Sequence, residues 1–296
     1  MGNILTKQFY RQRKDFEDSC AGRDAGLTFP EGVRCSTDIA YADDGIKAHV
    51  LDIYRPEDSQ EKILPVIINV HGGGLIIGNK EFNRYFCALL CKKGFLVYSI
   101  EYRLIPDCLI YDQIADVFMA MDYIKERLAA DGGDSSHVYM AGDSGGACLI
   151  TYANAIQNST NIARAANVTP SGLRINALGL ISGMFYTSRF DKIGLFLPKY
   201  LYGRDYKKTP FAKYVNPENR ELLNSLAPVW LVTSHNDFLR RYTTDFEKAL
   251  TRAEREHELV VFPKNKKLTH AFSVFEPFMP ESGAVIDMMV EYLRKF

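Results

Sequence analysis

The 296-residue sequence has no excess of charge of either sign, because 36 Lys and Arg residues balance 36 Asp and Glu residues. Without a global basic field there is no bulk attraction for nucleic acid or for an anionic lipid surface. Long hydrophobic runs are also missing: no segment approaches the roughly 18 apolar residues that span a bilayer, and the first ten residues lack the apolar core of a secretory signal. These absences predict a cytoplasmic protein with no nucleic-acid partner and no membrane span.

The six cysteines form no CxxC pair and have no histidine at zinc-ligand spacing. We therefore expect free thiols that pack as small hydrophobic side chains, and no metal site. With 47% hydrophobic and 24% charged residues, the composition is that of a globular chain, which excludes disorder and coiled coil. The length suits either two domains or one large α/β sheet.

Short apolar runs alternate with segments of helical periodicity along most of the chain. The runs predict strands at 35–41, 48–54, 66–70, 95–100, 138–141, 175–181, 229–233 and 259–262. The periodic segments predict helices at 81–93, 114–128, 148–156, 242–256 and 284–293, preceded by an amphipathic helix within residues 1–34. The first two strands form a predicted hairpin. Strands that alternate with helices indicate a parallel sheet covered on both faces.

Residues 183–214 interrupt this alternation with nine aromatic residues in 32 positions, where the chain average of 12% gives about four. A long insertion of this kind between two strands predicts a cap over the ligand-binding edge of the sheet. The alternative is that the rings pack the insertion onto the main domain.

A G-x-S-x-G pentapeptide, Gly142-Asp143-Ser144-Gly145-Gly146, lies between a predicted strand and a predicted helix. In this context the turn is so tight that its serine adopts strained backbone angles and exposes Oγ above the sheet. A phosphate-binding loop is the alternative, but the segment lacks the Lys of a P-loop and the spacing of a dinucleotide site. Ser144 is therefore the candidate nucleophile.

A second glycine-rich segment, His71-Gly72-Gly73-Gly74, follows the strand that ends at Val70. Glycines let backbone N–H groups point at a developing oxyanion without a side chain in the way. We expect the N–H groups of Gly73, Gly74 and Gly145 to form an oxyanion hole.

With HGGG at 71–74, YRLIPD at 102–107 and GDSGG at 142–146, the sequence resembles the hormone-sensitive-lipase-like family of α/β-hydrolase esterases over residues 35–296. The resemblance implies an α/β-hydrolase fold: an eight-stranded, mostly parallel sheet with helices on both faces and a helical cap. It places the catalytic core at 35–182 and 227–296 and the cap at 1–34 and 183–226. His71, Gly72 and Asp143 would support the two motifs.

A serine nucleophile needs an imidazole base and a carboxylate, which follow it in the chain order Ser, acid, His in this fold. Three histidines lie beyond Ser144. His270 is predicted to lie in a loop after the last strand and resembles the family's His-x-Phe site. His257 is expected at a polar helix end, and His235 lies two positions before the acid candidate.

The favoured acid is Asp237, which follows a predicted strand and resembles the family's Asp-x-Leu segment. Asp245 and Glu247 are the alternatives, although both fall within a predicted helix where a carboxylate faces solvent.

Several positions depart from the family pattern. Gly145 stands where the family has Ala after the nucleophile, and Ala147 stands at the third glycine. Leu75 replaces the aromatic residue that follows HGGG, so we expect it to reshape the acyl or alcohol pocket. Asp107 takes the acidic place of the YRLAPE segment.

The sequence therefore predicts a serine carboxylic ester hydrolase, without a cofactor, that acts on small to medium acyl esters through an acyl-enzyme. A non-catalytic ligand receptor with the same fold is the alternative outside enzymes. Within enzymes, acetyl or feruloyl ester removal and amide or formamide hydrolysis use the same machinery. The resemblance also admits a homodimer through the edge of the last strand, which no sequence feature indicates.

Overall fold

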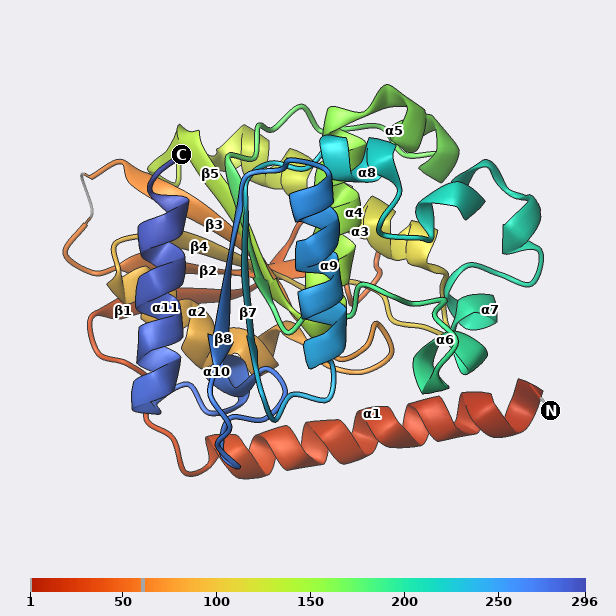
Figure 1. Ribbon diagram of the computed structural model, residues 1–296. Helices are drawn as coiled ribbons and strands as arrows, with labels where there is room; N and C mark the ends of the chain where they lie inside the picture. The colour runs from red at the N-terminus through yellow and green to blue at the C-terminus, as the bar shows by residue number, and fades with distance from the viewer. Residues whose placement is uncertain (1, 60–61) are drawn as a thin grey trace.

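A computed structural model describes residues 2–59 and 62–296. The predicted cap range 1–34 and core range 35–182 therefore include residues 1 and 60–61, which lie outside the described part. One continuous sheet forms the centre of the molecule, with helices packed on both of its faces (Figure 1). This confirms the predicted fold class.

The sheet has eight strands in the order β1-β2-β4-β3-β5-β6-β7-β8. The hairpin strands pair antiparallel, as does β2 with β4, and every other pair is parallel. The sheet is therefore mostly parallel, as predicted. The strands are β1 (Val33–Ala40), β2 (Val50–Pro56), β3 (Leu64–Val70), β4 (Leu96–Ile100), β5 (Gly133–Asp143), β6 (Ala177–Ile181), β7 (Val229–Ser234) and β8 (His257–Phe262).

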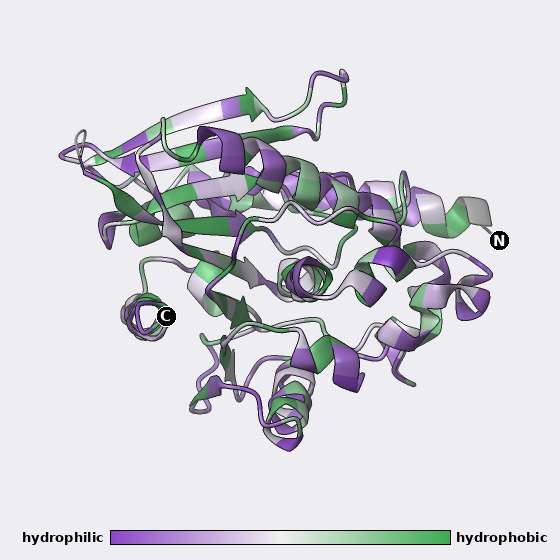
Figure 2. Cartoon of the chain, turned by 90° about the horizontal axis from the view of Figure 1, so that it is seen from above, coloured by the Kyte–Doolittle hydropathy of each residue, from purple (hydrophilic) through white to green (hydrophobic). Residues whose placement is uncertain are grey.

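Two helical layers cover this sheet, each above its own buried hydrophobic cluster. Seen from above, the central strands carry mostly hydrophobic residues, while the outer helices also carry hydrophilic ones (Figure 2). One layer contains α3 (Ile110–Arg127), α4 (Ser144–Asn158), α5 (Thr160–Ala166) and α9 (Arg240–Arg252). The other contains α2 (Arg84–Lys92), which follows the 3-10 turn η1 (Lys80–Asn83), together with α10 (Phe272–Phe275) and α11 (Pro280–Leu293).

Several predicted helix boundaries are wrong. The helices expected from 114 and from 284 begin earlier, at Ile110 and at Pro280. The helix expected at 148–156 begins earlier, at Ser144, because it continues directly from the tight turn after β5. The helix expected at 242–256 ends at Arg252, since Glu254 adopts a positive φ of 53° that an α-helix cannot contain. His257 therefore begins strand β8 instead of ending a helix.

The insertion after β6 folds into short helices and 3-10 turns. Five of its nine aromatic residues are buried, and Phe185 stacks on Phe246 of α9 at 4.2 Å between ring centroids. Much of the aromatic content thus packs the insertion onto the main domain. The short elements are α6 (Lys192–Phe196), α7 (Pro198–Leu201), η2 (Tyr206–Lys208), η3 (Pro210–Tyr214) and α8 (Arg220–Asn224).

The N-terminal helix α1 (Gly2–Asp24) runs along one edge of the molecule, with α6 and α7 beside it (Figure 1). Phe9 of α1 packs against Tyr200 of α7, with 5.2 Å between ring centroids. The two segments predicted as cap, far apart in the sequence, are therefore in contact.

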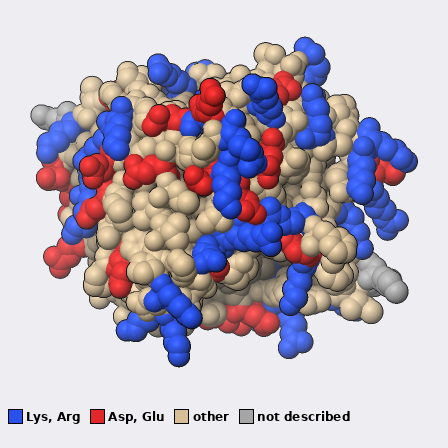
Figure 3. Space-filling model, viewed as in Figure 1, with Lys and Arg blue, Asp and Glu red and all other residues tan. Residues whose placement is uncertain are grey.

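Acidic and basic side chains are interspersed over the face shown in Figure 3, in keeping with the balanced composition. All six cysteines are free. Among residues 2–59 and 62–296, no helix is both long and apolar enough to cross a membrane. Within these described residues, no group of three or more His, Cys, Asp or Glu side chains is arranged so that it could hold a metal ion.

Candidate active site

Ser144 lies at the carboxyl end of β5, where the strand turns directly into α4. Its φ of +50° is unusual for a residue with a side chain and marks a strained turn. A Cβ on Gly146 would lie 2.1 Å from the carbonyl oxygen of Val70, and one on Gly142 would lie 2.9 Å from the same oxygen. Only glycine fits at these two positions, so the tight packing of β3 against residues 142–146, the nucleophile turn, fixes Ser144 at the sheet edge.

His270 reaches the same point from the loop between β8 and α10. Its Nε2 lies 2.9 Å from Ser144 Oγ, within hydrogen-bond distance. The backbone of the next residue, Ala271, donates to Ser182 Oγ at 3.1 Å, which ties the loop to the end of β6. His270 is thus placed to accept the proton of the serine hydroxyl.

Asp237 follows β7 and lies on the other side of the imidazole, with its Oδ1 2.8 Å from His270 Nδ1. The carboxylate also accepts hydrogen bonds from Thr233 Oγ1 at 2.9 Å and from the backbone N–H of Leu239 at 2.8 Å. Burial alone would raise the pKa of Asp237, but hydrogen bonds and charge from His270, with further donors, lower it below its ordinary value. An ionised carboxylate therefore faces the imidazole.

The alternative site residues lie elsewhere. Asp245 forms an ion pair with Arg189 at 2.9 Å, and Glu247 lies 3.5 Å from His257. His235 contacts Arg240. The structure thus brings together Ser144, His270 and Asp237 and leaves the other candidates out.

The glycine-rich segment after β3, here called the oxyanion loop (residues 71–78), passes directly beside the nucleophile turn. Gly73 and Gly74 have φ values of +104° and +60°. A Cβ on Gly145 would lie 2.8 Å from the amide nitrogen of Leu75 and 3.0 Å from that of Gly74. Within the described residues, the N–H groups of Gly73 and Gly74 donate no hydrogen bond, so they are free to bind an oxyanion.

Leu75 also has a positive φ, of 68°, but its side chain is completely buried in the core. It does not line the cavity beside Ser144. The expectation that Leu75 shapes an acyl or alcohol pocket is therefore wrong, because the backbone conformation turns this side chain inward.

The buried side chain of His71, the first residue of the oxyanion loop, supports this loop. Its Nδ1 lies 2.8 Å from the carbonyl oxygen of Gly72, its Nε2 lies 3.1 Å from Glu101 Oε1, and its ring stacks on Tyr102. Burial would lower the pKa of His71, but the Glu101 carboxylate and the other acceptors raise it above its ordinary value. Because both ring nitrogens face acceptors, the arrangement favours a doubly protonated ring.

Asp143 links the nucleophile turn to the oxyanion loop. Its Oδ1 accepts hydrogen bonds from the Gly72 N–H and from Asn83 Nδ2, both at 3.0 Å. Burial raises the pKa of this carboxyl, against the opposing effects of Asn83 and of the nearby imidazoles. A Cβ on Gly72 would lie 2.1 Å from Asp143 Oδ2, so glycine is required at that position. The support predicted for His71, Gly72 and Asp143 corresponds to these contacts.

A cavity of about 290 Å³ opens beside Ser144 and His270. Apart from the candidate site residues, its walls are apolar and come from α1, the oxyanion loop, the insertion, the segment after β7 and α10. None of the nine aromatic residues of the insertion contributes. The apolar lining residues are Phe16, Ile76, Ile77, Met184, Ile193, Leu197, Phe238, Leu239 and Phe275.

These wall residues could not be located from the sequence, because they come from separate segments that only the fold brings together. One signal was present for Phe238: it lies beside the predicted acid, and its ring contacts the His270 ring at 4.4 Å while remaining 74% exposed. Glu101 was also missed, although it immediately precedes the YRLIPD segment.

Comparison with known proteins agrees with the observed fold. A family described as alpha/beta hydrolase fold matches residues 67–273. The isoprenylcysteine alpha-carbonyl methylesterase of Arabidopsis thaliana is 27% identical over 133 residues, covering 45% of this chain and 31% of that protein. The amyloplastic tuliposide A-converting enzyme b1 of Tulipa gesneriana is 30% identical over 131 residues, covering 40% and 35%. The chain spans less than half the length of the curated relatives it matches.

Among solved structures, esterase B from Lactobacillus rhamnosis superposes with a TM-score of 0.92 at 22% identity, over 99% of this chain and 95% of that chain. A bacterial heroin esterase superposes with a TM-score of 0.73 at 23% identity, over 98% and 92%. At this level of identity the likeness shows a shared fold.

Proposed function

The chain belongs to the α/β-hydrolase family, and from this premise we propose that it is a serine carboxylic ester hydrolase that acts through an acyl-enzyme intermediate. The observation that carries the proposal is the continuous hydrogen-bonded series from Asp237 through His270 to Ser144, with distances of 2.8 and 2.9 Å. Relatives and structural neighbours named as esterases support the same reaction class.

In the proposed reaction, Ser144 Oγ attacks the ester carbonyl carbon while His270 Nε2 takes the hydroxyl proton. Asp237 holds the Nδ1–H of the imidazole and stabilises the imidazolium that forms. His270 then gives its proton to the departing alcohol. The same imidazole next takes a proton from water, which attacks the acyl carbon and releases the acid.

The N–H groups of Gly73, Gly74 and Gly145 hold the oxygen that becomes negative in each tetrahedral intermediate. Two of them come from the oxyanion loop, and the third belongs to the first turn of α4, where helix N–H groups lack intrahelical partners. The chemistry needs no cofactor.

The cavity favours a small to medium acyl group. Its volume of about 290 Å³ lies at the lower limit of ordinary small-molecule sites, and its lining is almost entirely apolar. The proposed substrate is therefore a small to medium, uncharged acyl ester. The proposed cap consists of residues 1–34 and 183–226 over a core of 35–182 and 227–296. The cytoplasmic location and a homodimer remain predictions.

The test is hydrolysis of nitrophenyl acetate, butyrate, octanoate and palmitate by wild type, Ser144→Ala, His270→Ala and Asp237→Asn. We expect losses in kcat of about 10⁶-fold for the first two variants and about 10⁴-fold for the third. Ser188→Ala and His137→Ala are matched controls, since both residues are exposed and lie away from the cavity.

Activity that falls from butyrate to palmitate supports the small acyl site, and a rate that rises to the longest chain contradicts it. If folded wild type and Ser144→Ala are equally inactive on all four esters, the protein is not an esterase, and a ligand receptor or an amide hydrolase becomes the better description.

A further inference from the structure

The helix α1 is mostly exposed, yet some of its side chains contact the segments around the candidate active site. Phe16 forms part of the apolar wall of the cavity. Arg23 donates to the carbonyl oxygen of Phe82 at 3.0 Å and fixes the end of the helix. Arg13 precedes both residues in the helix. It contacts other segments through hydrogen bonds and an ion pair and does not line the apolar cavity.

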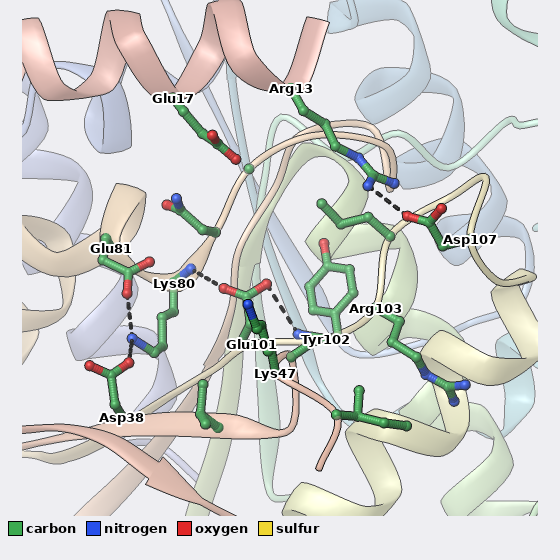
Figure 4. Close-up of a pocket in the computed structure, with 16 residues that line it drawn as sticks. Arg13, Glu17, Asp38, Lys47, Lys80, Glu81, Glu101, Tyr102, Arg103 and Asp107 are labelled. Carbon is green, nitrogen blue, oxygen red and sulfur yellow. Dashed lines mark hydrogen bonds and ion pairs between the residues drawn. The ribbon is translucent and has the colours of Figure 1, made fainter. Parts of the chain in front are cut away.

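Arg13 is largely buried, with 17% of its side chain exposed, and its guanidinium reaches two separate loops. Its Nε donates to the carbonyl oxygen of Ile76 at 2.7 Å, and its Nη2 donates to that of Ile105 at 2.6 Å. Its Nη1 forms an ion pair with Asp107 at 2.7 Å. Figure 4 shows Arg13 extending from α1 toward Asp107, and both residues line a cavity of about 570 Å³ that also has other charged side chains in its walls.

The contact with Ile76 is two hydrogen bonds away from the proposed oxyanion donors. The N–H of Ile77, which belongs to the same peptide group as the Ile76 carbonyl, donates to the carbonyl oxygen of Gly73 at 3.0 Å. That carbonyl belongs to the same peptide group as the N–H of Gly74, a proposed oxyanion donor. Hydrogen bonds in such a series orient and polarise one another.

The contact with Ile105 reaches the same loop by a second route. The N–H of Ile105 donates to the carbonyl oxygen of Leu75 at 3.0 Å, and Leu75 directly follows Gly74. One guanidinium therefore holds the oxyanion loop both directly, at Ile76, and through the neighbouring segment at Ile105.

We propose that Arg13 is a positioning residue for the oxyanion loop, so that turnover depends on the docking of α1 even where the substrate does not touch this helix. The inference rests on the proposed esterase function, because it assigns the Gly74 N–H to the oxyanion. Arg13 contacts neither Ser144 nor the apolar cavity beside it, and it acts only through the oxyanion loop that it holds.

A purely structural role predicts a different result. If α1 were only a wall, losing Arg13 would loosen the helix and resemble the loss of Phe16, with a higher KM and a changed preference for acyl length. A positioning role predicts a lower kcat for every acyl length, because each ester places its carbonyl oxygen in the same hole.

The experiment compares Arg13→Ala, Arg13→Lys, Phe16→Ala and the matched control Arg11→Ala on nitrophenyl acetate and butyrate. Arg11 lies on the same helix and is 84% exposed, and its ion pair among the described residues is with Asp15 at 3.8 Å. The second readout is the rate at which a nitrophenyl phosphonate labels Ser144, since its charged oxygen occupies the oxyanion position.

We expect Arg13→Ala to lower kcat and the labelling rate about tenfold for both esters, a fraction of the 10²- to 10³-fold effect of removing a donor outright. Arg13→Lys keeps the charge but lacks the planar set of N–H donors that binds both carbonyl oxygens, so it restores activity only in part. Phe16→Ala changes KM and acyl preference, and Arg11→Ala matches wild type. The melting temperature shows whether each variant is folded, and Arg13→Lys carries the test if Arg13→Ala does not fold.

Equal kcat and labelling rates for Arg13→Ala and Arg11→Ala in an active enzyme would overturn the positioning role and leave the esterase function intact. The same holds if Arg13→Ala shifts KM and acyl preference as Phe16→Ala does. If wild type hydrolyses neither ester and the phosphonate does not label Ser144, the esterase function itself fails and this inference fails with it.

Discussion

The nucleophile turn and the oxyanion loop are both glycine-rich connections after parallel strands, but they are held in place in different ways. The nucleophile turn is fixed locally, because β5 ends at Asp143, α4 begins at Ser144 and neighbouring glycines pack against the backbone of β3. The oxyanion loop is held by side chains from other parts of the chain: His71 rests on Glu101, and Arg13 of α1 binds Ile76.

This difference indicates how the two parts of the site respond to change. A turn fixed by steric contact tolerates no added atom, and altering it affects folding. A loop held by distant hydrogen bonds can loosen while the fold persists, and altering its supports affects the rate. The predictions below separate these two behaviours.

Gly146→Ala is expected to have the largest effect. The added Cβ would lie 2.1 Å from the Val70 oxygen and 2.5 Å from the His71 oxygen, and neither backbone atom has room to move. We expect a loss of about 3 kcal/mol or more in the free energy of unfolding. Urea denaturation provides the measurement.

The matched control for this variant is Gly283→Ala in α11, where no atom lies within 4 Å of the added Cβ. Alanine is about 1 kcal/mol more favourable than glycine within a helix, so this control should unfold at the same or a higher urea concentration. Equal midpoints for the two variants would refute the steric account of the nucleophile turn.

Gly145→Ala tests the contact between the nucleophile turn and the oxyanion loop. Its Cβ would lie 2.8 Å from the amide nitrogen of Leu75 and 3.0 Å from that of Gly74, so the oxyanion loop must shift away from Ser144. We expect kcat to fall by less than the roughly 100-fold effect of losing an oxyanion donor, because the resembled family has alanine at this position, while the unfolding midpoint changes little. The kcat for nitrophenyl butyrate is the measurement, and unchanged kcat would show that the loop adapts without cost.

The local nature of the nucleophile turn explains why the sequence predicted it well. The pattern from Gly142 to Gly146 contains its own steric requirements, and the eight apolar runs contain the alternation that builds the sheet. The candidates Asp237 and His270 were found because each follows a strand, and strand ends meet at one edge of a parallel sheet.

The supports of the oxyanion loop and the cavity walls could not be predicted in the same way. Arg13 and Ile76 are 63 positions apart, and nothing in either segment indicates the other. No pattern in the sequence indicated the inward turn of Leu75, or the positive φ of Glu254 just after the end of α9. The aromatic content of residues 183–214 indicated a cap, but the residues of this segment that line the cavity are Met184, Ile193 and Leu197.

Glu101→Gln tests the support beneath the oxyanion loop. The raised pKa of His71 means that its charged pairing with Glu101 is present at and below the ordinary histidine range and is lost only as pH rises through the raised value. The amide removes the charge, so burial then keeps His71 neutral near pH 7, with one proton left for the Gly72 carbonyl. We expect kcat to fall about tenfold while the fold is retained, because a donor is weakened but not lost.

The pH dependence of kcat for wild type and Glu101→Gln is the measurement, with the exposed Glu291→Gln as the control. At neutral pH the kcat of wild type should be higher than that of the variant. This difference should disappear at alkaline pH, where His71 gives up its second proton. A ratio of the two kcat values that stays constant with pH would contradict a charged His71.

Asp107→Asn is expected to have the smallest effect, since Asp107 is the outermost support of the loop and is 47% exposed. Burial alone would raise the pKa of this carboxyl, but the hydrogen bonds from Tyr10 and Arg13 lower it below its ordinary value. The stabilisation is therefore complete above the ordinary carboxyl range and is lost as pH falls through the lowered value. At pH 7 we expect the variant to lose under about 1 kcal/mol in unfolding free energy, as for other exposed ion pairs.

Urea denaturation of wild type and Asp107→Asn, from pH 7 down to the lowest pH at which both remain folded, checks this sign. The difference between the two proteins should shrink as the pH falls, because protonated Asp107 no longer pairs with Arg13. Asp205→Asn is the matched control, since Asp205 is 78% exposed and pairs only with Lys208. A difference that grows toward low pH would mean that Asp107 does not anchor Arg13 as a carboxylate, and the outer support of the oxyanion loop would then rest on the backbone carbonyls of Ile76 and Ile105 alone.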